Sequence, residues 1–141
     1  MLGDLWSWDG TNWTQLATGG PPATMMASMA FDSARGRAVL FGGVATSGLS
    51  RQTWEWNGTS WTQMAPTLSP PLGLGCIAYD PARQRTVFFA SLSSPHETWE
   101  WDGSQWSRIL TPNMPPSSGF ATMVFHPGRN RIVLAADKPS P

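Results

Sequence analysis

The sequence predicts an all-β protein built from repeated four-stranded antiparallel sheets, and three series of equally spaced segments predict it. One series contains all nine tryptophans, a second interleaves with it, and a third is a recurring pair of prolines. Identical spacing in three units of about 47 residues indicates a structural repeat. The segments are LWSWDGTNWTQ (5–15), TWEWNGTSWTQ (53–63) and TWEWDGSQWSR (98–108); AFDSARGRAVLFGG (30–43), AYDPARQRTVFFAS (78–91) and VFHPGRNRIVLAAD (124–137); and Pro21-Pro22, Pro70-Pro71 and Pro115-Pro116.

The first two strands of each unit come from the interleaving series. They alternate with period two, contain aromatic and β-branched residues, and are bounded by turn residues, which is typical of short strands. The first strand is rich in Ala, Ser, Gly and Cys, which suits a crowded inner edge. We expect first strands at 25–31, 74–79 and 120–125, and second strands at 38–41, 86–89 and 132–134.

The third and fourth strands of each unit come from the tryptophan segments. The Trp-x-Trp stretch is the third strand, and the fourth begins at the third tryptophan and continues for about four residues. Between them a dipeptide that tolerates positive φ predicts a tight hairpin. These dipeptides are Asp9-Gly10, Asn57-Gly58 and Asp102-Gly103.

An aspartate begins the turn between the first and second strands in two units. Asp32 and Asp80 open this turn, and arginines such as Arg83 and Arg85 follow it. We expect these arginines to bond the aspartate or nearby carbonyl groups. In the third unit His126 replaces the aspartate, so that bond is lost there.

A four-stranded antiparallel unit with this repeat length is a β-propeller blade. The sequence resembles the kelch family, galactose oxidase-type repeats included: Gly42-Gly43 closes a second strand, an aromatic residue stands in the third and a Trp in the fourth. The motif Trp-x-Trp-Asp-Gly is similar to that of a bacterial subgroup. The resemblance weakens where Ala90-Ser91 and Ala135-Ala136 replace the glycine pair. It implies a kelch-type propeller with three blade equivalents.

We expect a single domain, 1–141, in which one blade is split: its third and fourth strands come first in the chain and its first and second strands come last. Three blades are too few to close a ring, because propellers use four to eight. We expect a homodimer in which two copies exchange strands to form a six-bladed ring. The alternative, given similar weight, is a portion of a longer propeller. The units are 5–16 (third and fourth strands of a split blade), 24–64 and 73–109 (blades), and 120–136 (first and second strands of the split blade).

Composition argues against two classes of partner. Nine Lys plus Arg balance nine Asp plus Glu, so no basic surface for nucleic acid or an anionic membrane is expected. No apolar run approaches the roughly 18 residues of a membrane span, and no signal peptide pattern opens the chain. We expect a soluble chain, while a secreted parent protein and the compartment stay open. The single cysteine, Cys76, allows no internal disulfide.

No catalytic, cofactor or metal site is expected. The copper-radical oxidation of galactose oxidase-type relatives needs two tyrosines, one of them cross-linked to cysteine, and two histidines. This chain has one tyrosine, Tyr79. His96 and His126 lie in connections on opposite faces of a blade, so they cannot share an ion with Cys76 or Tyr79. Paired-carboxylate, Ser-His-Asp and phosphate-loop arrangements are absent from the sequence.

The tryptophans have two interpretations. Equal spacing in every unit favours packing between blades, whereas an exposed indole would suit the apolar face of a sugar. If one tryptophan per blade is exposed, Trp8, Trp56 and Trp101 are the first candidates. The expected structural motif residues are Trp8, Trp13, Trp56, Trp61, Trp101, Trp106, Gly42 and Gly43.

Variation among the units predicts where recognition would lie. The links between successive blades (17–24, 65–73, 110–119) and the loops between second and third strands (44–52, 92–97) differ most, and they share one face, named here the loop face. Polar candidates on it are Arg51, Gln52, His96 and Glu97. We expect a non-enzymatic scaffold that binds protein or carbohydrate. The alternatives are a non-catalytic part of a larger secreted carbohydrate-active enzyme or oxidase, and an assembling fragment without a ligand.

Overall fold

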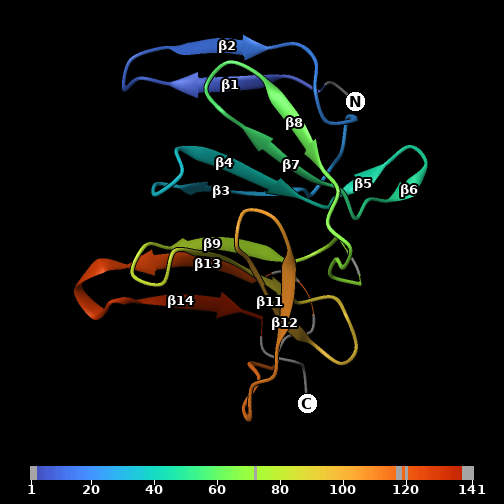
Figure 1. Ribbon diagram of the computed structural model, residues 1–141, viewed down its shortest axis with the longest axis vertical. Helices are drawn as coiled ribbons and strands as arrows, with labels where there is room; N and C mark the ends of the chain where they lie inside the picture. Colours follow the sequence, from blue (N-terminus) through green and yellow to red (C-terminus); the bar gives the residue numbers. More distant parts are fainter. Residues whose placement is uncertain (1–2, 72, 117–118, 120, 138–141) are drawn as a thin grey trace.

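Two four-stranded antiparallel sheets and three two-stranded hairpins make up the structure (Figure 1). It is a computed structural model that describes residues 3–71, 73–116, 119 and 121–137. The predicted fold class, all-β with four-stranded antiparallel sheets, is confirmed. Within the described ranges, helical structure is limited to one 3-10 turn, Pro127–Arg129, so none of it offers a helix able to cross a membrane.

The two complete sheets each have their strands in the order of the chain. The first sheet runs β3-β4-β7-β8 and the second runs β9-β10-β11-β12. Their bounds are β3 Ser28–Asp32, β4 Arg37–Phe41, β7 Thr53–Trp56 and β8 Trp61–Met64, then β9 Cys76–Asp80, β10 Arg85–Ala90, β11 Glu97–Trp101 and β12 Trp106–Ile109.

Two hairpins lie beside these sheets in the chain, and each has the sequence of half a sheet. The N-terminal hairpin, β1 (Leu5–Trp8) and β2 (Trp13–Ala17), has a Trp-x-Trp segment. The C-terminal hairpin, β13 (Ala121–His126) and β14 (Arg131–Ala136), has the sequence of first and second strands. The expected start of its first strand, Phe120, lies outside the described residues. The two hairpins are well separated (Figure 1).

The Trp-x-Trp hairpins owe their shape to period-two alternation and to the turn that follows. The second and third tryptophans of each segment stand directly opposite one another, as Trp101 and Trp106 do. The turn is closed by the aspartate or asparagine side chain: Asp102 Oδ1 accepts the backbone N–H groups of Ser104 and Gln105 at 2.7 and 2.8 Å. Gly103 then takes φ +103°, as the predicted turn chemistry requires.

The turn between first and second strands is closed in the same way. Asp32 Oδ1 accepts the backbone N–H groups of Ala34 and Arg35, each at 3.1 Å. In the third unit His126 Nδ1 accepts the backbone N–H of Arg129 at 3.2 Å. The histidine therefore keeps a backbone bond of the turn, although it brings no negative charge.

The core lies between the two complete sheets. It consists of side chains from β4, β9, β10, β11 and β12, and aromatic rings meet at its centre. The ring of Phe41 lies 4.8 Å from that of Phe88 and 5.0 Å from that of Trp106, centroid to centroid. Its buried members are Val39, Phe41, Ile77, Phe88, Ala90, Trp99, Trp101 and Trp106.

The glycine pair brings the two sheets together near the loop face. Gly42 and Gly43 have φ of +78° and +94°, and a Cβ on Gly42 would stand 2.1 Å from the carbonyl oxygen of Gly73. The Gly43 N–H donates to that same oxygen at 2.7 Å. A side chain at position 42 would therefore push the link before β9 away from the first sheet.

The first strands of the sheets and the C-terminal hairpin lie side by side. β9 lies between β3 and β13, so the inner edges of three blade-like units are neighbours (Figure 1). A third hairpin, β5 (Val44–Ala45) and β6 (Gly48–Leu49), was not predicted and forms within the loop between β4 and β7.

Candidate functional site

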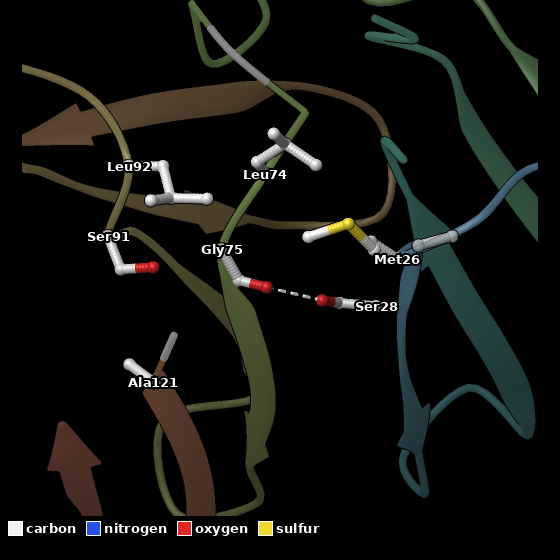
Figure 2. A pocket seen from close by; sticks show the side chains of 8 residues that line it. Met26, Ser28, Leu74, Gly75, Ser91, Leu92 and Ala121 are labelled. Carbon is white, nitrogen blue, oxygen red and sulfur yellow. Dashed lines mark hydrogen bonds between the residues drawn. The ribbon is translucent and has the colours of Figure 1, made fainter. Parts of the chain in front are cut away.

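A depression opens where the inner strands begin, on the predicted loop face (Figure 2). Its volume is about 240 Å³. The links before β3 and β9, the loop after β10 and the start of β13 contribute to it, so three blade-like units share the site. The lining residues are Met26, Ala27, Ser28, Leu74, Gly75, Ser91, Leu92 and Ala121.

One hydrogen bond between two units shapes the wall of this depression. The Ser28 hydroxyl donates to the Gly75 carbonyl oxygen at 2.6 Å, which ties β3 to the link before β9 (Figure 2). Gly75 has no room for a side chain, because a Cβ would stand 2.1 Å from the Phe89 carbonyl oxygen. The position of the link is therefore set by backbone contacts, which favours a preformed site.

The lining of the depression is uncharged and largely apolar. Of the described residues that line it, none carries an ionisable side chain, and Ser28 and Ser91 add hydroxyl groups to an otherwise apolar wall. Such a surface offers contact area and a few hydrogen bonds but no general acid or base. The described part of the chain also contains no group of three or more His, Cys, Asp or Glu side chains placed to hold a metal ion.

Cys76 and Tyr79 follow on β9, and neither has the environment of a reactive group. Burial raises the pKa of the Cys76 thiol to about 11. Burial also raises the pKa of Tyr79, and the neighbouring Asp32 carboxylate adds to that effect. A cysteine reacts as its thiolate, so the Cys76 side chain is inert near neutral pH.

Arg51 and Gln52, two of the predicted recognition residues, use their polar groups within the chain. Arg51 Nε donates to the Pro70 carbonyl oxygen at 3.0 Å, and its Nη2 donates to that of Ser69 at 3.1 Å. Gln52 Oε1 accepts the indole N–H of Trp54 at 3.0 Å. Arg51 therefore holds the link before β9 in place, and Gln52 orients the Trp54 side chain on β7.

His96 and Glu97, the other two, lie together where β11 begins. Glu97 accepts the indole N–H of Trp99 at 2.8 Å and forms an ion pair with Arg108 at 3.0 Å. The His96 ring lies 5.8 Å from that of Phe89, and its buried Nδ1 has no hydrogen-bond partner among the described residues. None of the four predicted residues lines the depression.

The exposure of the tryptophans differs between the complete sheets and the N-terminal hairpin. Trp56 and Trp101 are buried, as the packing interpretation expects, so the alternative of one exposed tryptophan per blade does not apply to them. Trp8 is 51% exposed and Trp13 is 64% exposed, whereas their counterparts Trp101 and Trp106 are 1% and 2% exposed. The reason is packing, since the first sheet covers Trp101 and Trp106, whereas no described sheet covers Trp8 and Trp13 in this way.

A polar cluster at the junction of the two complete sheets includes the expected bond between the turn arginine and the turn aspartate, whereas the part of Glu55 and Trp101 in it was not predicted. Glu55, on β7, accepts the indole N–H of Trp101 from the next sheet at 2.8 Å. Arg35 makes two bonds to the Glu55 carboxylate, at 3.1 and 2.8 Å, and one to Asp32 at 2.7 Å. Although burial acts to raise it, the hydrogen bonds from Arg35 hold the pKa of Asp32 below its ordinary value.

A second bond at the same junction is neutral. Trp106 Nε1 donates to the Thr53 hydroxyl at 2.8 Å, and both residues are buried. The third strand of one sheet, β7, thus presents two acceptors, Thr53 and Glu55, to tryptophans on the third and fourth strands of the next. The sequence held a signal for this, because Glu55 is a charged residue between two tryptophans of one strand.

The second sheet has the same two acceptor positions, but no tryptophan of the described chain donates to them. Thr98 and Glu100 occupy the positions of Thr53 and Glu55, and Arg83 bonds Glu100 as Arg35 bonds Glu55. Arg83 also lies 3.8 Å from Asp80. Its side chain is 55% exposed, against 31% for Arg35, because no further sheet covers it.

No family model matches the chain, and no curated protein matches it.

Proposed function

We propose that the chain is a non-enzymatic kelch-type propeller scaffold that binds a protein or carbohydrate ligand on its loop face. Two copies complete each other by strand exchange into a six-bladed ring. The observation that carries this proposal is the pair of hairpins, which correspond to opposite halves of one four-stranded sheet. β13 and β14 have the sequence of first and second strands, and β1 and β2 that of third and fourth strands.

The first sheet supplies the register of the proposed exchange. There β4 pairs with β7, with Val39 opposite Glu55 and Leu40 opposite Trp54. Aligning the repeats places Val133 of β14 opposite Ser7 in the partner copy, and Leu134 opposite Trp6. This pairing would cover the free edge of β14, and an uncovered strand edge favours uncontrolled association.

Substitutions shared by the two hairpins support their belonging to one blade. In both complete sheets an arginine lies between an aspartate and a glutamate: Asp32, Arg35 and Glu55 in the first sheet. The C-terminal hairpin keeps the arginine, Arg129, but has His126 in place of the aspartate, and the N-terminal hairpin has Ser7 in place of the glutamate. Both acidic positions of the same ion-pair network are therefore replaced together, as expected if the two hairpins form one sheet.

The loop face is the proposed recognition surface because the depression lies there. Ser28, Leu74 and Ala121 come from three consecutive units and meet around it. A site at the inner edges of several blades, at the mouth of a central channel, is a common place for a propeller to hold a ligand. Its lining, apolar apart from two serine hydroxyl groups, fits an uncharged ligand that combines an apolar face with a few polar groups, such as a glycan or a peptide segment.

Light scattering tests the assembly. The chain mass is 15.3 kDa, and the proposal expects a particle of about twice that mass at micromolar concentration. A stable monomer would contradict the ring.

A glycan array and a peptide display library, both probed with the wild-type protein, test recognition. The Leu74→Asp variant, which puts a charge into the depression, should lose any binding found. Leu68→Asp is the matched control, because Leu68 is exposed on the same face and does not line the depression. Binding that survives Leu74→Asp would place recognition elsewhere.

A further inference from the structure

We propose that Thr98 and Glu100 form a docking surface for Trp13 and Trp8 of a second copy of this chain. The inference rests on the proposed ring, and it names the contacts that hold one copy to the other. The tryptophans of the second copy are identified by analogy, because Trp101 and Trp106 already make the same contacts inside the chain.

The junction between the two complete sheets is the template. Trp101 and Trp106 each donate an indole N–H to the preceding sheet, to Glu55 and Thr53 respectively, both at 2.8 Å. All four side chains are buried. Buried donors and acceptors that satisfy each other define the geometry of a junction, since an unpaired one is costly.

The acceptors of the second sheet stand in the same arrangement. Thr98 and Glu100 have the positions on β11 that Thr53 and Glu55 have on β7, and Arg83 holds Glu100 as Arg35 holds Glu55. The Thr98 hydroxyl has only a 4.0 Å contact with the sulfur of Met114. The surface is therefore built and oriented, but it receives no tryptophan from within the described chain.

The donors of the N-terminal hairpin are preset in the required geometry. The rings of Trp8 and Trp13 lie 5.4 Å apart at 40°, and those of Trp101 and Trp106 lie 5.4 Å apart at 43°. Trp6 bonds Asp4, but neither Trp8 nor Trp13 donates its indole N–H to a described residue. One pair of indole donors without a described acceptor therefore matches one pair of acceptor side chains that receive no described tryptophan.

The hairpin turns give a third point of correspondence. Gly103 lies against the Arg35 guanidinium, where a Cβ would stand 2.7 Å from Nη1. Gly10, at φ +104°, is the equivalent glycine of the N-terminal hairpin and has open space around it. In the complex Gly10 would lie over Arg83, whose side chain is more exposed than that of Arg35.

A mixing experiment with Trp13→Phe and Thr98→Val tests the contact. A dimer with two-fold symmetry contains it twice, so each variant alone loses both bonds and leaves two groups unpaired. We expect the dissociation constant of each homodimer, measured by sedimentation, to rise on the order of 100-fold.

The mixture of the two variants is decisive. Their heterodimer has one intact contact, and both substitutions meet in the other. We therefore expect its dissociation constant to be about tenfold below the geometric mean of the two homodimers. A heterodimer at the geometric mean, or variants that dimerise as the wild type does, would overturn the inference while the ring itself stands.

The control pair is Trp6→Phe and Asp4→Asn, whose bond lies within one copy. Their heterodimer should fall at the geometric mean. Thermal melts followed by circular dichroism confirm that each variant folds. If the wild-type chain itself is monomeric, the proposed ring fails, and this inference fails with it.

Discussion

Glu55 illustrates how much a single side chain can organise. Its carboxylate is buried and binds Arg35 from the preceding turn and Trp101 from the neighbouring sheet. Hydrogen bonds to a charged group contribute more than neutral ones, and a partner left unpaired costs further free energy. One residue thus links two strands of its own sheet to the next sheet.

Replacing Glu55 by glutamine should lower the free energy of unfolding by about 2 kcal/mol, because the arginine loses its counter-charge while the side chain keeps its size. Chemical denaturation measures this loss of unfolding free energy. Glu100→Gln is the matched control, and both variants are measured at a protein concentration where the chain is monomeric. Its arginine is more exposed, so the expected loss is below about 1 kcal/mol. Equal losses would contradict the special role of the junction.

Asp32 makes stability depend on acid pH. Its pKa in the folded chain is held below the ordinary value of 3.8, so its contribution is present above that pH. The contribution disappears as the pH falls from about 3.8 through the folded value. In the Asp32→Asn variant, the free energy of unfolding should change less steeply between pH 5 and pH 2 than in the wild type. Identical slopes in denaturation series would show that Asp32 is not linked to folding.

Individual residue roles were harder to predict than residue classes. The tryptophans were expected to pack, and those of the second sheet do. The acceptors that receive their N–H groups were missed, because a strand pattern shows which face a residue occupies but not which residue of another sheet it meets. Gln52 and Glu97 were predicted as recognition residues because they are polar. Each instead accepts the indole N–H of the tryptophan two residues further along the chain.

At the scale of elements, local chemistry was enough for most of the strands. Alternation and turn dipeptides predicted the four-stranded sheets, since each Asp-Gly or Asn-Gly turn depends only on residues a few positions apart in the chain. The β5–β6 hairpin was missed because Val44 pairs with Leu49 in a register of only two residues per strand. So short a segment carries no periodic signal.

Gly42→Ala should destabilise the chain more than Gly58→Ala does. Both glycines have positive φ, which costs alanine about 1 kcal/mol. Only at position 42 would the new Cβ also meet the Gly73 carbonyl oxygen, while position 58 has open space. We expect an extra loss of roughly 2 kcal/mol at position 42, measured by urea denaturation. Equal losses would mean that the link before β9 moves freely.

The proposed strand exchange has a register that cysteine pairs can test. In a Cys76→Ala background, Ser7→Cys with Val133→Cys should give a covalent dimer on oxidation, because directly opposed residues have Cβ atoms about 5 Å apart. Ser7→Cys with Leu134→Cys is the control, since neighbouring residues of a strand point to opposite faces. Non-reducing electrophoresis measures the product. A covalent dimer from the control pair alone would contradict the register.

At the scale of the whole molecule, repetition in the sequence predicted the sheets but not their environment. The spacing of Trp8 and Trp13 is the same as that of Trp101 and Trp106, yet one pair is exposed and the other buried. Exposure depends on which units lie on either side, and that is a property of the three-dimensional arrangement. The depression was likewise found only in the structure, because residues from three units form it.

The proposed ring closure would make stability depend on protein concentration. The melting temperature of the single-copy chain should rise with protein concentration, because assembly stabilises the folded state by mass action. A tandem fusion of two copies should melt at a temperature independent of concentration and sediment like the wild-type dimer. Calorimetry and sedimentation velocity measure the two properties. A concentration-independent melt of the single-copy chain would argue against the ring.

The β5–β6 hairpin adds a consequence for recognition. It extends from the loop face, and its Leu49 is exposed. A ring with two-fold symmetry would carry this hairpin twice, on opposite sides of the channel mouth. A target with two suitably spaced epitopes would then bind at both, the second with a high effective concentration. Weak individual contacts would thereby give strong avidity, and a soluble monovalent fragment of the same target would bind poorly.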